Sequence, residues 1–137
     1  MPALEIKRPV AIKVIMTDQF RQQLISEAMD AIKSIEDNLH HMDSETLKQI
    51  QAVETSNPNQ ASLLTRQLEA EKERLIRMRG ELEWRIKEVE NVQNGAELPF
   101  RMLEGSVQLK VGDNFLEKVA KAEVVIKDWE IIEIREP

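Results

Sequence analysis

The sequence contains no cysteine, which excludes disulfide bonds, thiolate nucleophiles and thiolate zinc sites. Aromatic residues make up only 4 % of the 137 residues, as three phenylalanines and two tryptophans with no tyrosine. No stretch approaches the roughly 18 consecutive apolar residues that a membrane-spanning helix needs, and residues 1–14 lack the apolar core of a secretion signal. These absences predict a cytoplasmic protein with no membrane segment.

Signatures of catalysis and cofactor binding are missing as well. The chain has only four glycines and no Gly-rich phosphate-binding loop. His40 and His41 are the only histidines, and His41 has the i,i+4 spacing to Glu45 that can place two metal ligands on one helical face. Two ligands without a third are more typical of ordinary surface residues. We therefore expect no catalytic residues, no bound cofactor and no metal site.

Charged residues are plentiful, at 32 % of the chain with a net charge of −6. Residues 18–54 hold eight acidic and three basic side chains, whereas residues 59–94 hold seven of each. No segment concentrates the positive charge that a phosphate backbone attracts, so nucleic-acid binding is disfavoured without being excluded. The composition instead favours long helices with solvated faces.

The chain begins with a pattern typical of a β-strand. Residues 4–16 place apolar side chains at most even positions and charged ones at several odd positions, which predicts a strand with one buried face. Pro9 cannot donate a ladder hydrogen bond and indicates an edge or an irregularity. At Thr17 the period changes, and this hydroxyl is a good helix N-cap followed by Asp18 at the positive end of the dipole.

Two amphipathic segments of similar length follow. Their apolar residues step by four and three, the spacing of a coiled coil, and predict helices over residues 18–54 and 59–93. We call the contact positions of each helix, those at this four-three spacing, its seam. The first seam comprises Ala28, Ile32, Ile35, Leu39, Met42, Thr46, Gln49 and Val53, and the second comprises Leu64, Leu68, Glu71, Leu75, Met78, Leu82, Arg85 and Val89. The SNPNQ stretch between them, residues 56–60, breaks the helix. The economical solution is an antiparallel hairpin with its turn at residues 55–59.

The C-terminal part returns to β-like patterning. Residues 106–111, 122–127 and 129–136 read as strands, and residues 97–103 add another if Gly105 forms a turn. The predicted fold is α+β: a long antiparallel helical hairpin, a coiled coil, on a small β-sheet or barrel formed by the N-terminal and C-terminal strands. We expect one unit over residues 1–137, with strand 1–17, hairpin 18–94 and strands 95–137.

The sequence resembles the YlqD-like family of small bacterial proteins over nearly its whole length. The resemblance is carried by VAIKVIMTDQFRQQL at residues 10–24, GSVQLKVGDNF at residues 105–115 and AEVVIKDWEIIEIRE at residues 122–136. The family is of uncharacterised function and supplies no catalytic residues to transfer. The resemblance implies a bacterial cytoplasmic protein, in a setting near ribosome maturation.

Several apolar side chains beside the two seams are candidate partner-contact residues. Trp84 either covers the junction between helices and strands or lies exposed and anchors a partner. With it we group four further candidates: Ile76, Ile86, Leu47 and Ile50. A widened apolar stripe needs a cover, which a homodimer with the first helix of one chain against the second helix of the other provides.

The function predicted from these features is non-enzymatic. The hairpin presents its surface to another macromolecule, an unknown protein partner. The alternative is a ribosome- or RNA-associated maturation factor that uses the small β base.

Overall fold

The computed structural model describes residues 2–136, which form two compact units. Residues up to Arg21 and those from Val92 onward make the first unit, which contains a four-stranded sheet. Gln22–Asn91 make the second unit, which is a helical hairpin. The predicted α+β class with a long helical hairpin and a small sheet is therefore confirmed.

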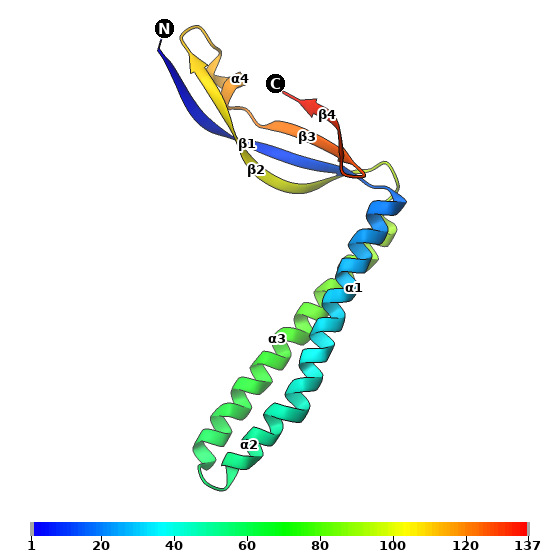
Figure 1. Cartoon of the computed structure of the whole chain (residues 1–137), viewed down its shortest axis with the longest axis vertical. Helices are drawn as coiled ribbons and strands as arrows, with labels where there is room; N and C mark the ends of the chain where they lie inside the picture. The colour runs from blue at the N-terminus through cyan, green and yellow to red at the C-terminus, as the bar shows by residue number, and fades with distance from the viewer. Residues whose placement is uncertain (1, 137) are drawn as a thin grey trace. The chain divides into compact units, whose positions relative to one another are not determined.

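The sheet is open and mixed, so of the two predicted alternatives it is the sheet and not the barrel that forms. Its strands are β1 (Ala3–Ile15), β2 (Glu97–Lys110), β3 (Ala122–Lys127) and β4 (Glu130–Arg135), in the order β2-β1-β3-β4 (Figure 1). β1 pairs antiparallel with β2 and parallel with β3, and β3 pairs antiparallel with β4. The N-terminal strand thus pairs with C-terminal strands on both of its sides.

Pro9 has the edge position that its missing N–H requires. Residues before Val10 pair with β2 alone, because the parallel ladder to β3 begins with Val10 opposite Ala122. On its β3 side, β1 is therefore an edge at Pro9, and an edge is a position where a strand can hold proline.

The expected turn at Gly105 is wrong, since Gly105 lies inside one continuous strand, β2, opposite Arg8. A Cβ atom at Gly105 would lie 3.0 Å from Cγ2 of Val10, which is tighter than ordinary packing. The glycine thus allows β2 to pass close to β1 instead of reversing the chain. The irregularity in β2 lies elsewhere, at Phe100, where the register to β1 shifts between Ile12 and Lys13.

The core of the first unit is formed by side chains of β1, of β3 and of residues 16–20. Met16, Val14 and Val125 are its most deeply buried side chains. A short helix, α4 (Phe115–Val119), joins β2 to β3 and packs against β2 and β1. The backbone on either side of the hairpin is tied together, since Met16 N donates to Ala96 O and Gly95 N donates to Met16 O.

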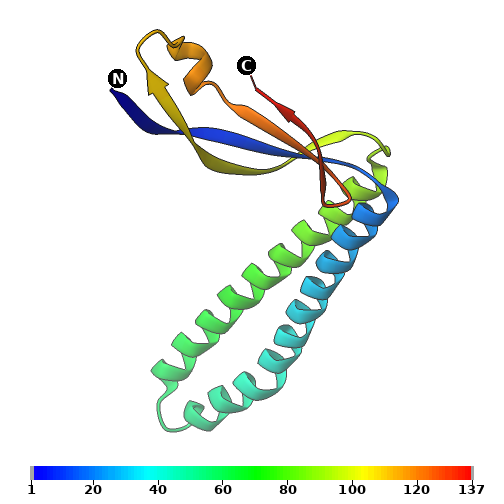
Figure 2. The same ribbon diagram turned by 45° about the horizontal axis from the view of Figure 1, so that its top comes forward.

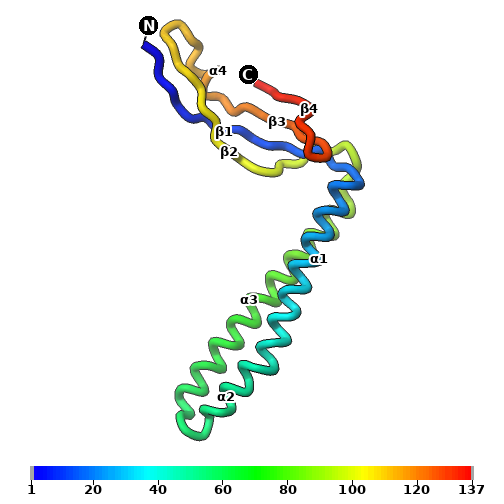
Figure 3. The backbone as a smooth tube through the Cα atoms, viewed as in Figure 1, coloured from blue at the N-terminus to red at the C-terminus, as the bar shows by residue number. Residues whose placement is uncertain are grey.

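The hairpin begins at its predicted cap. Phe20 N donates to Thr17 Oγ1 at 3.1 Å, as expected of an N-cap hydroxyl. Its first arm runs without a break through α1 (Asp18–His41), η1 (Met42–Thr46) and α2 (Leu47–Glu54), as the continuous trace shows (Figure 3). The second arm is α3 (Pro58–Asn91), antiparallel to the first (Figure 2).

The turn between the arms is shorter than predicted, because Pro58 belongs to α3 and not to the turn. Gln60 N donates to Asn57 Oδ1 at 3.2 Å, which makes Asn57 the N-cap and Pro58 the first helical residue. That position suits proline, since the first N–H of a helix has no partner inside the helix. Residues 55–57 alone remain between the helices.

A five-residue π-helical turn, η1, changes the predicted seam of the first arm. Gln49 was predicted on the seam, but it is exposed, whereas Ile50 is 6 % exposed and packs with Ala61 and Leu68. A π turn accommodates one extra residue, so the side chains after it are rotated along the helix by one position. The seam therefore runs from Met42 through Thr46 to Ile50, with steps of four and four.

Candidate interaction surfaces

The second helix of the hairpin, α3, carries two large apolar side chains on its outer face. Trp84 is 64 % exposed and Ile76 is 48 % exposed, whereas Leu68 and Leu75, on the side of α3 that faces the first arm, are buried. Gly80 lies four residues from each, so the three residues share one face of the helix. Trp84 is therefore exposed, and its role as an anchor for a partner stays a prediction.

Trp84 is held in place by its own helix. Its indole Nε1–H donates to Glu88 Oε1 at 2.7 Å, one helical turn away. The hydrogen bond satisfies the only polar group of the ring and limits its rotation, so an apolar face is presented to solvent in a defined orientation. Preorganised aromatic side chains of this kind are typical anchors of protein interfaces.

Gly80 has no explanation inside the chain. A Cβ atom placed on it would have nothing within 4 Å, and its backbone is helical. Glycine in a helix interior destabilises the helix by about 1 kcal/mol relative to alanine. Glycine leaves room for the close approach of another group at this point of the helix.

The other candidate partner-contact residues divide by burial. Leu47, at the start of α2, is 44 % exposed and is accessible. Ile86 is half-buried on the seam side of α3. Ile50 is part of the hairpin's own core with Ala61 and Leu68, so it is withdrawn from the candidate contacts. Its burial follows from the rotation that the π turn introduces.

A groove lies between the two arms of the hairpin. It has a volume of about 530 Å³ and is open to solvent. Its lining is Ala31, Ser34 and Ile35 from α1, and Met78, Glu81, Leu82 and Arg85 from α3. Arg85 was predicted as a polar residue of the seam, and it lines the groove from α3.

The polar seam residue Glu71 is tied within its own helix. Arg74 donates to both carboxylate oxygens of Glu71, through Nη2 at 2.5 Å and Nε at 3.0 Å. These hydrogen bonds lower the pKa of Glu71 and raise that of Arg74. Glu71 thus pairs within α3. A salt bridge between the two arms is formed by the neighbouring Lys72 ammonium of α3 and the Asp43 carboxylate of the π turn.

The sheet surface carries a cluster of four alternating charges. Arg135 on β4 binds Glu97 at 2.5 Å and Glu123 at 3.4 Å, and Lys13 on β1 binds Glu123 at 3.2 Å. Hydrogen bonding to Arg135 lowers the pKa of Glu97, and hydrogen bonding to Lys13 lowers the pKa of Glu123. The pKa of Arg135 is raised, chiefly by Glu97. All four groups are paired, so the cluster is suited to joining strands rather than to proton transfer.

Three of the five aromatic residues meet at the end of the sheet. The rings of Phe20, Phe100 and Trp129 make mutual edge-to-face contacts, with centroids 5.8 to 6.3 Å apart. Trp129 is 53 % exposed. It follows Asp128 in the two-residue turn between β3 and β4, where both residues have positive φ, 49° and 68°.

The exposed edge of the sheet is also apolar. β4 pairs with β3 on one side only, and its three isoleucines, Ile131, Ile132 and Ile134, are each more than half exposed. An edge strand of this kind has unpaired backbone groups next to apolar side chains. It is a second candidate interaction surface, which the sequence pattern predicted only as a strand.

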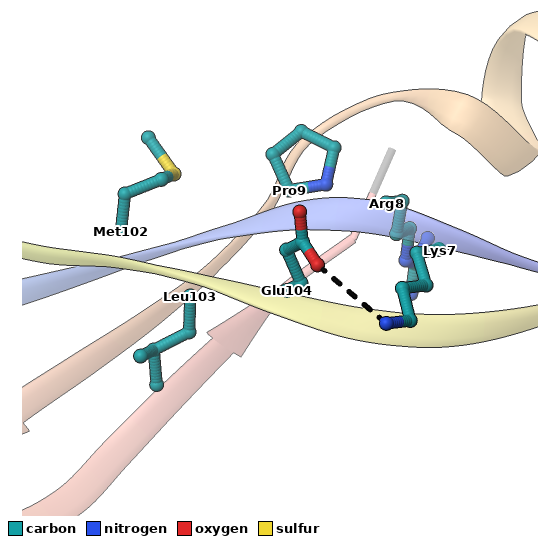
Figure 4. A pocket seen from close by; sticks show the side chains of 6 residues that line it. All are labelled: Lys7, Arg8, Pro9, Met102, Leu103 and Glu104. Carbon is teal, nitrogen blue, oxygen red and sulfur yellow. Dashed lines mark ion pairs between the residues drawn. The ribbon is translucent and has the colours of Figure 1, made fainter.

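A shallow depression on the sheet carries an ion pair across its surface. It is lined by residues of β1 and β2, and Lys7 Nζ lies 3.9 Å from Glu104 Oε2 (Figure 4). Lys7 and Glu104 pair with each other, and the further charged residue of the lining, Arg8, pairs with Glu136. Ligand sites instead combine an enclosed apolar cavity with a few convergent polar groups.

The histidine pair lies at the end of α1, next to the π turn. Within residues 2–136, no group of three or more His, Asp or Glu side chains is placed to hold a metal ion. In the same part of the chain, no helix combines the length and apolarity that crossing a bilayer requires.

Comparison with known proteins gives both sequence and structural relatives. The family described as YlqD protein matches residues 4–135 of the chain. A protein named Uncharacterized protein YlqD, from Bacillus subtilis (strain 168), is 24 % identical over 133 residues, which cover 97 % of this chain and 99 % of that protein. A crystal structure of a protein of unknown function from Synechococcus sp. WH 8102 has a TM-score of 0.86 at 23 % identity, with 98 % of each chain covered. Likeness at this identity establishes the fold alone.

Proposed function

The chain belongs to the YlqD family, which is of uncharacterised function, and we propose that it is a non-enzymatic interaction protein whose helical hairpin presents its outer face to another macromolecule. We place it in the cytoplasm, with a homodimer as its assembly and an unknown protein as a further partner. The observation that carries the proposal is the outer face of α3. There Trp84 is exposed, oriented by Glu88, and accompanied by Ile76.

Two further features support an interaction role. At about 1.5 Å per residue, the 34 residues of α3 extend about 50 Å, which offers more surface than a compact fold of this size. The shifted pKa values among the described residues arise from hydrogen-bonded ion pairs on the surface, whereas catalytic groups are usually shifted by burial in a cleft. The proposal therefore gives the protein no reaction to catalyse.

Comparison of the wild-type protein with Trp84→Ala tests the proposal. Both full-length proteins are immobilised on a support and incubated with extract from a bacterium that carries a family member. The retained macromolecules are then quantified by mass spectrometry. We expect at least one to be retained by the wild type and reduced about tenfold by Trp84→Ala, because aromatic anchors dominate interface energies. Met29→Ala is the matched control, since Met29 is an equally exposed apolar residue of α1.

Equal recoveries from wild type and Trp84→Ala would contradict the proposal. Circular dichroism checks that both variants stay folded, which we expect because both side chains are exposed. Retention of ribosomal particles that is insensitive to Trp84→Ala but lost at high salt would favour the alternative, a ribosome- or RNA-associated factor that binds through the sheet.

A further inference from the structure

The outer face of α3 has a symmetry that its own chain does not use. Gly80 lies midway between Ile76 and Trp84, four residues from each. Charged residues also lie at equal distances on either side of Gly80, and the two members of each such pair carry opposite charges. Glu73 and Lys87 lie seven residues from Gly80 on either side, and Arg77 and Glu83 lie three residues from it. Each residue before Gly80 in this set thus has a complementary residue at the same distance after it.

We propose that this face binds a second copy of the same chain, with the two α3 helices packed antiparallel and crossing at Gly80. The inference rests on the proposed function, because it takes the same face of α3 and names its occupant. In an antiparallel pair with its two-fold axis at Gly80, a residue that precedes Gly80 by a given number lies level with the residue that follows the second copy's Gly80 by that number. Glu73 is then level with the second copy's Lys87.

The absent side chain of Gly80 explains why the crossing falls there. Nothing occupies the space where its Cβ would lie, so the backbone of a second helix can approach closely at this point. Ile76 and Trp84, one turn to either side, then come to the same level as the second copy's Trp84 and Ile76. Exposed apolar side chains are thereby covered in both copies.

The charges of this face are available for contacts with a second copy. Within residues 2–136, Glu73, Arg77 and Lys87 form no salt bridge, and Glu83 is 4.0 Å from Arg79. Glu73 and Lys87 lie close to the line of contact, since they are within about 20° of Gly80 around the helix at 100° per residue. A parallel pair would place each of these charges against its own copy, so complementarity selects the antiparallel arrangement.

Analytical ultracentrifugation of the full-length protein over a concentration series tests the proposal. The wild type should show a monomer–dimer equilibrium above the 15.8 kDa monomer. Gly80→Leu should raise the dimer Kd at least about tenfold by separating the helices, while circular dichroism shows an intact hairpin. Ala70→Leu is the matched control, because Ala70 is also a small exposed residue of α3, and it should leave the Kd within about threefold.

A charge exchange provides the second arm of the test. Glu73→Lys and Lys87→Glu should each raise the dimer Kd about tenfold, because each sets like charges level with each other twice in the dimer. The double variant Glu73→Lys with Lys87→Glu should return the Kd to within about threefold of the wild type. Contacts within one helix cannot cause this rescue, since the double variant still has like charges at positions 73 and 77, and at positions 83 and 87, of each chain.

Failure of the rescue would overturn the antiparallel α3 pair, as would a wild type that stays monomeric at every concentration. A dimer that is unaffected by Gly80→Leu but lost on Met29→Ala would indicate instead that α1 of one copy packs against α3 of the other. A wild type that stays monomeric but still retains another macromolecule through Trp84 would overturn the inference and leave the proposed function standing. The inference and the proposed function can therefore fail separately.

Discussion

At the scale of single residues, the turn between β3 and β4 carries the clearest strain. Asp128 and Trp129 both have positive φ, a conformation that a two-residue hairpin turn needs and that Asn-Gly adopts easily. For bulky residues such φ values cost on the order of 1–3 kcal/mol. Compensating contacts are present, because Thr17 Oγ1 donates to Asp128 Oδ1 at 2.5 Å and the Trp129 ring contacts Phe20 and Phe100.

This strain predicts an unusual order of stability for two variants of Trp129. Trp129→Ala and Trp129→Gly lose the same ring contacts, but only glycine also relieves the positive φ. We expect Trp129→Gly to be more stable than Trp129→Ala by about 1 kcal/mol, the reverse of the usual preference in strands and helices. Urea unfolding followed by circular dichroism measures the difference. An equal stability, or a more stable alanine variant, would show that the turn is not strained at this residue.

Residues whose signal is local were predicted correctly, and residues whose role depends on distant contacts were not. Thr17 was predicted as an N-cap from its position at a change of period, and Phe20 N donates to it. Gly105 and Phe100 depend on the neighbouring strand, since Val10 limits the space at Gly105 and the register shift in β1–β2 places Phe100. A single sequence gives no pairing register, so neither role could be read from it.

At the scale of the elements, the sheet is joined on one surface by ion pairs that respond to pH. Lys13 on β1, Glu97 on β2, Glu123 on β3 and Arg135 on β4 connect all four strands. The two carboxyl groups have folded-state pKa values below their ordinary value of 4.5, because Arg135 donates to Glu97 and Lys13 donates to Glu123. In the unfolded chain these contacts are lost and both groups bind protons more readily.

The sheet should therefore lose stability in acid. Lowered folded-state pKa values stabilise the fold above pH 4.5, and this contribution disappears as the pH falls below 4.5 through the folded-state values. The midpoint temperature of thermal unfolding should fall between about pH 6 and about pH 3. This fall should be smaller in Glu97→Gln than in the wild type. Glu5→Gln, on β1 outside the cluster, is the control. Identical slopes for wild type and Glu97→Gln would contradict the prediction.

The π turn predicts where the first arm tolerates the deletion of one residue. If Met42–Thr46 accommodates one extra residue, deletion of Ser44 should convert it to regular α-helix while Ile35 and Ile50 both stay on the seam. Deletion of Lys33 from α1 offers no such adjustment, and it should move buried side chains off the seam at a cost above about 2 kcal/mol.

Chemical denaturation of the two deletion variants compares them directly. We expect the Ser44 deletion to be the more stable by at least about 2 kcal/mol. Similar losses in both would show that the π turn does not absorb an extra residue.

The extent of the helices and strands was largely predictable, but the number of residues in the π turn was not. Periods of two and of 3.6 residues are properties of neighbouring side chains, so they identified β1 and both arms of the hairpin. The extra residue in Met42–Thr46 is detected only by comparing which positions are buried before and after the π turn. A strict four-three pattern continued through it by using Thr46 and Gln49, which are polar. The burial of Ile50 in place of Gln49 reveals the shift.

At the scale of the whole molecule, the chain enters and leaves the sheet unit around the hairpin. β1 precedes the hairpin and β2, β3 and β4 follow it, so the parallel β1–β3 pairing needs the chain to return to where it started. Hydrogen bonds between Met16 and the Gly95–Ala96 segment, and between Arg21 and Asn94, close this return inside the sheet unit. We therefore expect the formation of the sheet to be coupled to that of the hairpin.

The last prediction is that the two units unfold together, as expected for the single unit predicted from the sequence. The tryptophans provide one probe in each: Trp129 lies in the sheet unit and Trp84 in the hairpin. Labelling with 5-fluorotryptophan gives two ¹⁹F resonances, which Trp84→Phe assigns. Because an unfolded hairpin would leave the ends of β1 and β2 untethered, both resonances should report the same midpoint in urea, within about 0.2 M. Two separated transitions would show that the hairpin and the sheet are independent folding units.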